Sequence, residues 1–168
     1  MIPTKAMTPH VPVTPDEIVA QVLDACKLGI TIVHLHVRDD DGAPCLSVEK
    51  YAEVIAGIRE SAPSLVVCVS LSGRFCSDPQ ERAAVLDLDG DLKPDMGSLT
   101  LGSLNFSRQA SINTPETILF LAERMQERAI KAELEAFDAG MLNYAHYLLK
   151  KGALSGPQYV NLIAGNIA

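Results

Sequence analysis

The feature that most limits the folds open to this chain is a regular alternation between amphipathic helices and short, almost wholly apolar strands. Five segments have strand character, at residues 31–37, 65–71, 96–101, 131–137 and 158–164. Strands that are apolar along their whole length belong to sheets covered on both faces, and strands separated by helices pair in parallel. The sequence therefore predicts an α/β fold built on a parallel sheet.

Capping residues mark where the intervening helices begin. Thr14-Pro15-Asp16-Glu17 combines an N-cap, a proline at the first helical position and a glutamate at N3, which together form a capping box. We expect Gly29 to close this first helix. A short helix and three longer ones, ending near residues 61, 129 and 151, are predicted behind the N-caps Ser47, Asp78, Thr114 and Asp138. Five helices thus alternate with five strands.

Two features favour a (β/α)₈ barrel of the TIM type over an open, doubly wound sheet. No G-x-G-x-x-G motif follows any strand, so the fingerprint of a dinucleotide-binding sheet is absent. In addition, a TIM barrel builds its active site at the C-terminal ends of several strands. Polar residues gather at those ends here, namely His36, Ser70, Ser98, Thr100, Glu133, Glu135 and Asn161.

The number of strands is smaller than a closed barrel requires. A TIM barrel has eight strands and typically about 250 residues, whereas the 168 residues of this chain contain five predicted strands and begin with a helix. We expect residues 1–168 to form a single, partial TIM-barrel domain that lacks the first strand and the last two. Such a domain would leave open sheet edges at residues 31–37 and 158–164.

The charge and hydropathy of the chain argue against two kinds of partner. The net charge is −7, and the longest basic run is the pair Lys150-Lys151, so we expect no nucleic-acid partner. No apolar run reaches the roughly 18 residues of a membrane span, so we expect no membrane partner.

The four cysteines, Cys26, Cys45, Cys68 and Cys76, include no C-x-x-C pair, which argues against a structural zinc knuckle. Cys26 and Cys68 lie in apolar patterns, and we expect them to be small buried hydrophobic residues. A reduced, cytoplasmic protein is the simplest interpretation of these thiols.

His34 and His36 lie one residue apart at the end of the first strand. Residues i and i+2 of a strand share a face, with Cα atoms about 6.5–7 Å apart, so two such imidazoles can hold one zinc ion at about 2.0–2.1 Å. A bare His-x-His is more often merely hydrogen-bonded. Here the apolar strand before the pair and the acidic loop after it favour a metal site. We do not expect His10 or His146 to be ligands.

Three charged residues near these positions have open interpretations. Arg38 and Asp39 follow the histidine pair, and we favour a structural role for Arg38 in the loop. Asp39 could pair with Arg38 or accept the imidazole N–H of a metal-bound histidine, which would fix its tautomer. Glu135 shares a strand face with Glu133, so Glu135 is either a proton acceptor near neutral pH or a structural acid in an ion pair.

Six motifs together resemble the β-keto acid cleavage enzymes: MTPHVPVTPDEI, IVHLHVRDDDG, SLSG, KPDMGSLTLGSLNF, ELEAFDAGM and QYVNLIAG. The resemblance implies a zinc-dependent TIM barrel, usually oligomeric, that condenses a β-keto acid with acetyl-CoA to give acetoacetate and a new CoA thioester. It also implies roles for single residues. The metal ligands would be His34 and His36, the substrate-binding residues Ser70, Ser98 and Thr100, and the catalytic carboxylate that of Glu135.

The sequence departs from that family in two respects. It has Ser-Leu-Ser-Gly at residues 70–73, where Ser/Thr-Thr-Gly-Gly is common, and it has no counterpart of the late-strand glutamate and aspartate that complete the zinc site and supply the base. Because a catalytic zinc normally has three protein ligands, we expect this chain alone to be inactive. The rival interpretations are an amidohydrolase-like, metal-dependent TIM-barrel hydrolase and a non-catalytic fragment.

Overall fold

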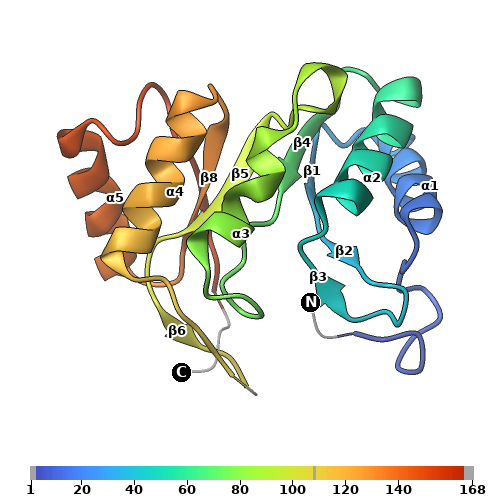
Figure 1. Ribbon diagram of the computed structural model, residues 1–168, viewed down its shortest axis with the longest axis horizontal. Helices are drawn as coiled ribbons and strands as arrows, with labels where there is room; N and C mark the ends of the chain where they lie inside the picture. Colours follow the sequence, from blue (N-terminus) through green and yellow to red (C-terminus); the bar gives the residue numbers. More distant parts are fainter. Residues whose placement is uncertain (1–2, 108, 165–168) are drawn as a thin grey trace.

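A five-stranded parallel sheet organises the protein, which is a computed structural model that describes residues 3–107 and 109–164. The spatial order of the strands is their order along the chain: β1 (Ile32–Leu35), β4 (Val66–Val69), β5 (Met96–Thr100), β8 (Lys131–Ala136) and β9 (Tyr159–Leu162). Because each crossover moves one strand onward with the usual right-handed sense, the helices fall on one side of the sheet. Figure 1 shows the curled sheet with the helices along its outer side. The fold is of the incomplete TIM-barrel type, as predicted.

Five α-helices connect and precede these strands. They are α1 (Pro15–Cys26), α2 (Val48–Ser61), α3 (Pro79–Ala83), α4 (Pro115–Glu127) and α5 (Ala139–Lys151). Each begins after its predicted N-cap, and at α1 the capping box forms in both directions between Thr14 and Glu17. Gly152 ends α5 in the left-handed conformation, with φ of 75°. The first helix ends earlier than predicted, at Cys26, three residues before Gly29.

Two short hairpins, which the sequence pattern did not predict, leave the sheet at the C-terminal ends of β1 and β5 (Figure 1). The first apolar strand is broken at His36, after which β2 (Val37–Arg38) pairs antiparallel with β3 (Pro44–Cys45). The second hairpin pairs β6 (Leu104–Asn105) with β7 (Ala110–Ser111). Apolar character alone did not separate Val37, which is buried in the first hairpin, from the strand of the main sheet.

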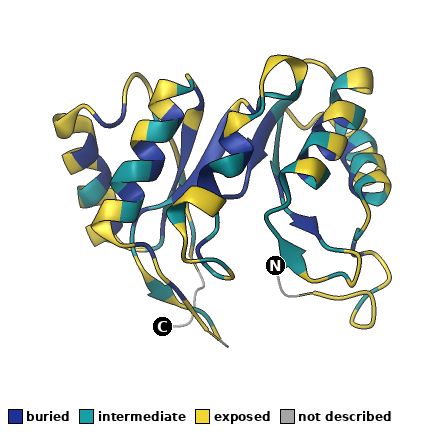
Figure 2. Cartoon of the chain, in the orientation of Figure 1, coloured by how far each residue is buried: buried dark blue, intermediate teal, exposed yellow. Residues whose placement is uncertain are grey.

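The two faces of the sheet differ in chemistry near the strand ends. Leu35, Val69, Leu99 and Leu134 pack into the hydrophobic core shared with the helices, and Figure 2 shows the buried side of the helices turned toward the strands. Because side chains alternate along a strand, the residues next to these four in each strand point to the opposite, inner face. That inner face carries the polar residues. None of the helices in the described ranges has the length and hydropathy needed to span a bilayer.

Both outer strands of the sheet have one unpaired edge among the described residues, since β1 pairs only with β4 and β9 only with β8. The β1 edge borders a groove of about 390 Å³ whose far wall is formed by apolar residues of α1, including Ile18, Val22 and Ala25. The β9 edge exposes large side chains, among them Val160 (39% exposed) and Leu162 (71% exposed). Open apolar edges of this kind favour pairing with other chains.

We therefore expect the purified chain to self-associate as its concentration rises, through the sheet edges. Losing the burial of one leucine, which is worth about 1.5–3 kcal/mol, should raise the dissociation constant by about tenfold or more in Leu162→Lys. Leu142→Lys, at an exposed leucine of α5 (40% exposed), is the matched control and should leave the association unchanged. Sedimentation velocity over a concentration series measures this, and a wild-type monomer at every concentration would contradict it.

Candidate active site

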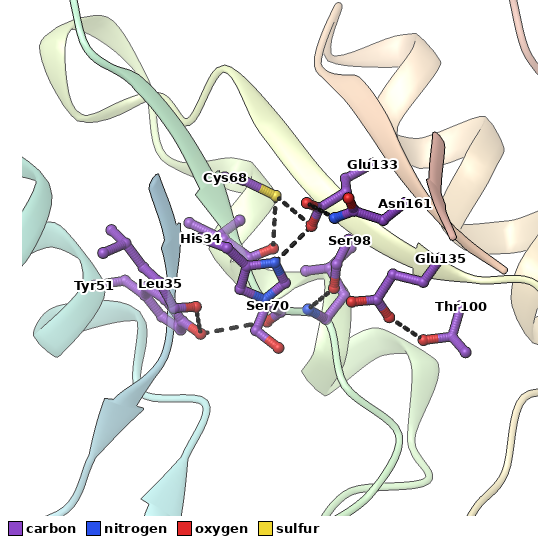
Figure 3. Close-up of polar contacts among 12 residues, drawn as sticks. His34, Leu35, Tyr51, Cys68, Ser70, Ser98, Thr100, Glu133, Glu135 and Asn161 are labelled. Carbon is purple, nitrogen blue, oxygen red and sulfur yellow. Dashed lines mark hydrogen bonds and ion pairs between the residues drawn. The ribbon is translucent and has the colours of Figure 1, made fainter. Parts of the chain in front are cut away.

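The register of the parallel strands brings a set of polar residues from distant parts of the chain onto the inner face of the sheet. His34 of β1 lies beside Cys68 of β4, Ser98 of β5 lies beside Glu133 of β8, and Thr100 lies beside Glu135. Cα partners in a parallel pair point to the same face. The resulting group is drawn in Figure 3. It lies toward the C-terminal ends of the strands, where the sequence predicted the site.

Glu133 is the centre of this group. Its carboxylate accepts hydrogen bonds from His34 Nδ1 (2.5 Å), Asn161 Nδ2 (2.7 Å) and the Cys68 thiol (3.3 Å), and the residue is 3% exposed. Burial is the largest influence on its pKa and raises it, but the bonds and charge of His34, with the bond from Cys68, bring the pKa below its ordinary value. Glu133 is therefore a buried, ionised carboxylate with three donors.

The two imidazoles share the inner face, as the strand spacing predicted. Their ring centroids are 5.0 Å apart. Because Nδ1 of His34 is bonded to the Glu133 carboxylate, Nδ1 carries a proton, and Nε2 is the nitrogen that has a free lone pair when the ring is neutral. His36, by contrast, has its pKa lowered to about 3, first by burial and then by the positive charge of His34. It is a neutral imidazole, which is the form that binds metal.

The ionisation of His34 depends on its carboxylate neighbours. Burial is the largest influence on the pKa of His34 and lowers it, but the hydrogen bond and charge of Glu133, joined by the charge of Glu135, raise the pKa above its ordinary value. An imidazole fixed by a carboxylate in this way has a defined ring orientation and tautomer, the arrangement found at metal-binding histidines.

The donor atoms of this group fit a transition-metal ion. In the described ranges, the ligand atoms of His34, Cys68 and Glu133 all lie within 4.8 Å of one another, and His36 adds a second imidazole. Nitrogen, sulfur and carboxylate oxygen are the ligands that zinc takes in proteins. The interpretation of Cys68 as a plain hydrophobic residue was incomplete. The residue is buried, but its thiol points to Glu133 on the polar face.

The other predicted site residues lie on or beside the same face. Thr100 Oγ1 donates to Glu135 Oε2 (2.5 Å), so this carboxylate is held by a neighbouring strand. Ser98 Oγ accepts a bond from the Leu71 amide (3.0 Å), which supports the loop after β4. Ser70 is buried, and its carbonyl accepts a bond from the Tyr51 hydroxyl (3.3 Å). Figure 3 shows both serines beside the histidine and glutamate side chains.

Arg38 and Asp39 lie in the first hairpin, away from the imidazole contacts. The Arg38 guanidinium donates to the carbonyls of Pro3 and Gly42, both at 2.7 Å, which agrees with the structural role favoured for it. Asp39 Oδ1 accepts bonds from the turn amides of residues 41 and 43. The structure thus shows an Asp39 oxygen accepting from amides of its own turn. The carboxylate that contacts His34 is that of Glu133, which sequence reasoning did not select as a site residue.

A second group that sequence reasoning missed fixes the loop after β4. The buried Arg82 donates to the Leu71 carbonyl (2.8 Å) and to Asn113 Oδ1 (2.7 Å), which ties this loop to the segment before α4. At Gly73 an added Cβ would lie 2.6 Å from the Ile112 carbonyl oxygen, so only glycine fits there. The Ser-Leu-Ser-Gly segment is thus held in one position beside the polar face.

Comparison with known proteins gives a consistent family match. Residues 1–168 match the family profile described as beta-keto acid cleavage enzyme. The 3-oxoadipate:acetyl-CoA acetyltransferase of Cupriavidus necator is 38% identical over 164 residues, which are 98% of this chain and 56% of that protein. A 3-keto-5-aminohexanoate cleavage enzyme of Fusobacterium nucleatum is 35% identical over 96% of this chain and 58% of its own length. The chain thus spans somewhat more than half the length of these relatives.

Solved structures of ObcA share the fold. The apo structure superposes with a TM-score of 0.84 at 21% identity, and it covers 96% of this chain and 38% of that one. A ternary complex of ObcA with a C4-CoA adduct and oxalate gives a TM-score of 0.86, also at 21% identity, and covers 96% of this chain and 39% of that one. At this level of identity the likeness supports the TIM-barrel-type architecture alone.

Proposed function

The chain belongs to the β-keto acid cleavage enzyme family, and on that premise we propose that it takes part in the condensation of a β-keto acid with acetyl-CoA. The bond between the ketone carbon and the α-carbon of the keto acid breaks, and the acetyl group of acetyl-CoA joins that α-carbon, giving acetoacetate. The rest of the keto acid leaves as a new CoA thioester. The observation that supports this most directly is the half-buried His34 bonded to the buried Glu133 carboxylate, beside a neutral His36.

We propose His34, through Nε2, and His36 as ligands of a zinc ion. When bound, zinc polarises the ketone carbonyl and stabilises the negative charge that develops on its oxygen. Glu133 would fix the orientation of His34 from behind, since its oxygen already accepts the Nδ1 proton. Two histidines are one ligand fewer than a catalytic zinc normally has. For that reason we expect the 168 residues alone to bind metal weakly and to turn over little substrate.

Glu135 is the proposed proton acceptor. Its carboxylate is held by the Thr100 hydroxyl from the neighbouring strand and faces the same side of the sheet as the histidines. A carboxylate in that position can take the proton from the α-carbon of the keto acid. The hydroxyls of Ser70 and Ser98, which lie between the histidine and glutamate strands, are proposed to bind the keto acid.

The wider setting is also a proposal. All four cysteines are free thiols, which supports a reducing compartment such as the cytoplasm. The exposed apolar side chains of β9 support a homo-oligomer, and the net charge of −7 argues against nucleic acid as a partner.

A substitution pair tests which atoms hold the metal. We expect Cys68→Ser to retain zinc at wild-type affinity, because the Cys68 thiol is a donor to Glu133 and burial raises its pKa. We expect Glu133→Gln to weaken zinc binding by about 10–100-fold, the usual cost of losing a carboxylate behind a metal-bound histidine. Competition with a fluorescent chelator measures both affinities.

Cobalt substitution supplies the independent check. A cobalt-loaded wild-type chain should show no thiolate-to-cobalt charge-transfer band if the ligands are His34 and His36. A strong band that disappears in Cys68→Ser would instead assign the ion to the group of His34, Cys68 and Glu133.

A further inference from the structure

Arg74 is held rigidly at the rim of the candidate site. It follows Gly73 in the loop after β4, and its carbonyl accepts a hydrogen bond from Gln109 Nε2 (2.9 Å), which ties the loop to the β6–β7 hairpin. Its guanidinium carbon lies 3.6 Å from the centroid of the Phe106 ring. Phe106 in turn packs edge-on against Phe137, directly after β8. Stacking of this kind fixes the guanidinium plane while leaving its N–H edge available.

The Arg74 side chain has no hydrogen-bond or ion-pair partner among the described residues, and its Nε is buried without an acceptor. Every other arginine in the described ranges donates to a carboxylate or a carbonyl; these are Arg38, Arg59, Arg82, Arg124 and Arg128. A guanidinium has five N–H donors and cannot become neutral in a protein. Of the Arg74 donors, Nε is buried without an acceptor, and leaving a buried donor unpaired is costly, so the arrangement points to a ligand that supplies an acceptor.

Arg74 lies close to the proposed catalytic groups without pairing with them. The positive charge of Arg74 is one of the influences that lower the pKa of His36. Burial lowers the pKa of Arg74 itself, and the negative charge of Glu135 partly opposes this. The Glu135 carboxylate nevertheless bonds to Thr100 and forms no ion pair with Arg74. Through its stack on Phe106, which packs against Phe137 directly after β8, the guanidinium lies among the loops that follow the strand ends.

We propose that Arg74 binds a second carboxylate at the far end of the substrate, so that the preferred substrates are β-keto dicarboxylates. This inference rests on the proposed function, which places the ketone at the zinc ligands His34 and His36 and has the Ser70 and Ser98 hydroxyls bind the keto acid deeper in the sheet. A substrate that extends from there toward the loops brings its distal group to the rim. Guanidinium binds carboxylate through two parallel hydrogen bonds, whereas a neutral distal group would leave the buried Nε without an acceptor.

A matched pair of ligands tests this inference. The compounds 3-oxohexanedioate and 3-oxohexanoate have the same chain length and differ by the distal carboxylate. Isothermal titration would measure the dissociation constants of both, and of acetyl-CoA, with the wild-type chain and with Arg74→Leu, Arg74→Lys and Arg124→Leu. The last variant removes a half-buried arginine of α4 that pairs with Asp87, and it is the control.

We expect Arg74→Leu to weaken binding of the dicarboxylate by about 10–100-fold, the usual effect of losing a charged hydrogen-bonded pair, and to change monocarboxylate binding less than about twofold. Arg74→Lys should fall between, because it keeps the charge but loses the two parallel bonds. Arg124→Leu should match the wild type.

Three outcomes would overturn the assignment: equal losses for both keto acids, a loss confined to acetyl-CoA, or a wild-type chain that does not prefer the dicarboxylate. A urea midpoint for Arg74→Leu close to that of the wild type shows that the loop still folds. Binding needs no turnover. A chain that binds the dicarboxylate through Arg74 but performs no CoA-thioester exchange would contradict the proposed function alone.

Discussion

Replacing His34 by alanine is expected to remove bound zinc and, with it, any CoA-thioester exchange that the protein performs. The substitution deletes the Nε2 ligand and also leaves the buried Glu133 carboxylate without the donor that lies 2.5 Å from it. Loss of a carboxylate behind a metal-bound histidine already costs about 10–100-fold in affinity, so loss of the histidine itself should exceed that range. Metal analysis of the purified protein, dialysed against a fixed free-zinc concentration, measures the effect.

Two further variants make this result specific. His146→Ala removes an exposed histidine of α5 and should keep the wild-type zinc content. His34→Gln keeps a donor near Glu133 and separates the lost ligand from the lost hydrogen bond. Wild-type zinc content in His34→Ala would refute the metal assignment. Exchange that persists in the fully metal-stripped protein, or hydrolysis of amides or esters without CoA, would favour the hydrolase rival.

Glu135→Gln is expected to behave differently, with zinc retained and turnover greatly reduced. The glutamine keeps the size of the side chain and can still accept the hydrogen bond from the Thr100 hydroxyl, but it cannot take a proton. Loss of a general base typically costs about 10²–10⁴-fold in rate. The assay follows exchange between acetyl-CoA and a panel of β-keto acids. It is run on this chain and on a chimera that adds the unmatched segments of the Cupriavidus relative.

The control for this variant is Glu123→Gln, at an exposed glutamate of α4. It should retain both zinc and turnover. If Glu135→Gln loses zinc together with activity, Glu135 is a metal ligand rather than a proton acceptor. If it keeps full turnover, the base is another group.

Local chemistry makes most of this fold predictable from the order of its residues. The N-caps Ser47, Thr114 and Asp138 predicted helix starts that the structure confirms, because capping depends on residues within one turn of each other. The five parallel strands follow from apolar runs that are also local in sequence. The period of a strand predicted that His34 and His36 share a face, and their rings do lie together although β1 ends at Leu35.

Contacts between residues of different strands could not be predicted from local sequence. The bond between His34 and Glu133 joins residues 99 positions apart, and that between Cys68 and Glu133 joins residues 65 positions apart. Glu133 and Glu135 share one strand face, so no local pattern distinguishes the residue that contacts the imidazole from the one that Thr100 holds. Only the register of β8 against its neighbours decides this, because a shift of two residues along the strand would put Glu135 where Glu133 now lies.

The sequence by itself thus determined the strand and helix order, the polar end of the sheet and the histidine pair, all of which depend on residues near one another in the chain. The tertiary structure alone decided that Glu133 lies behind His34, that the Cys68 thiol turns to the polar face, and that Arg74 stacks on Phe106 with no partner among the described residues. Those features depend on how separate strands and loops pack, and packing free energy is summed over contacts that sequence proximity does not encode.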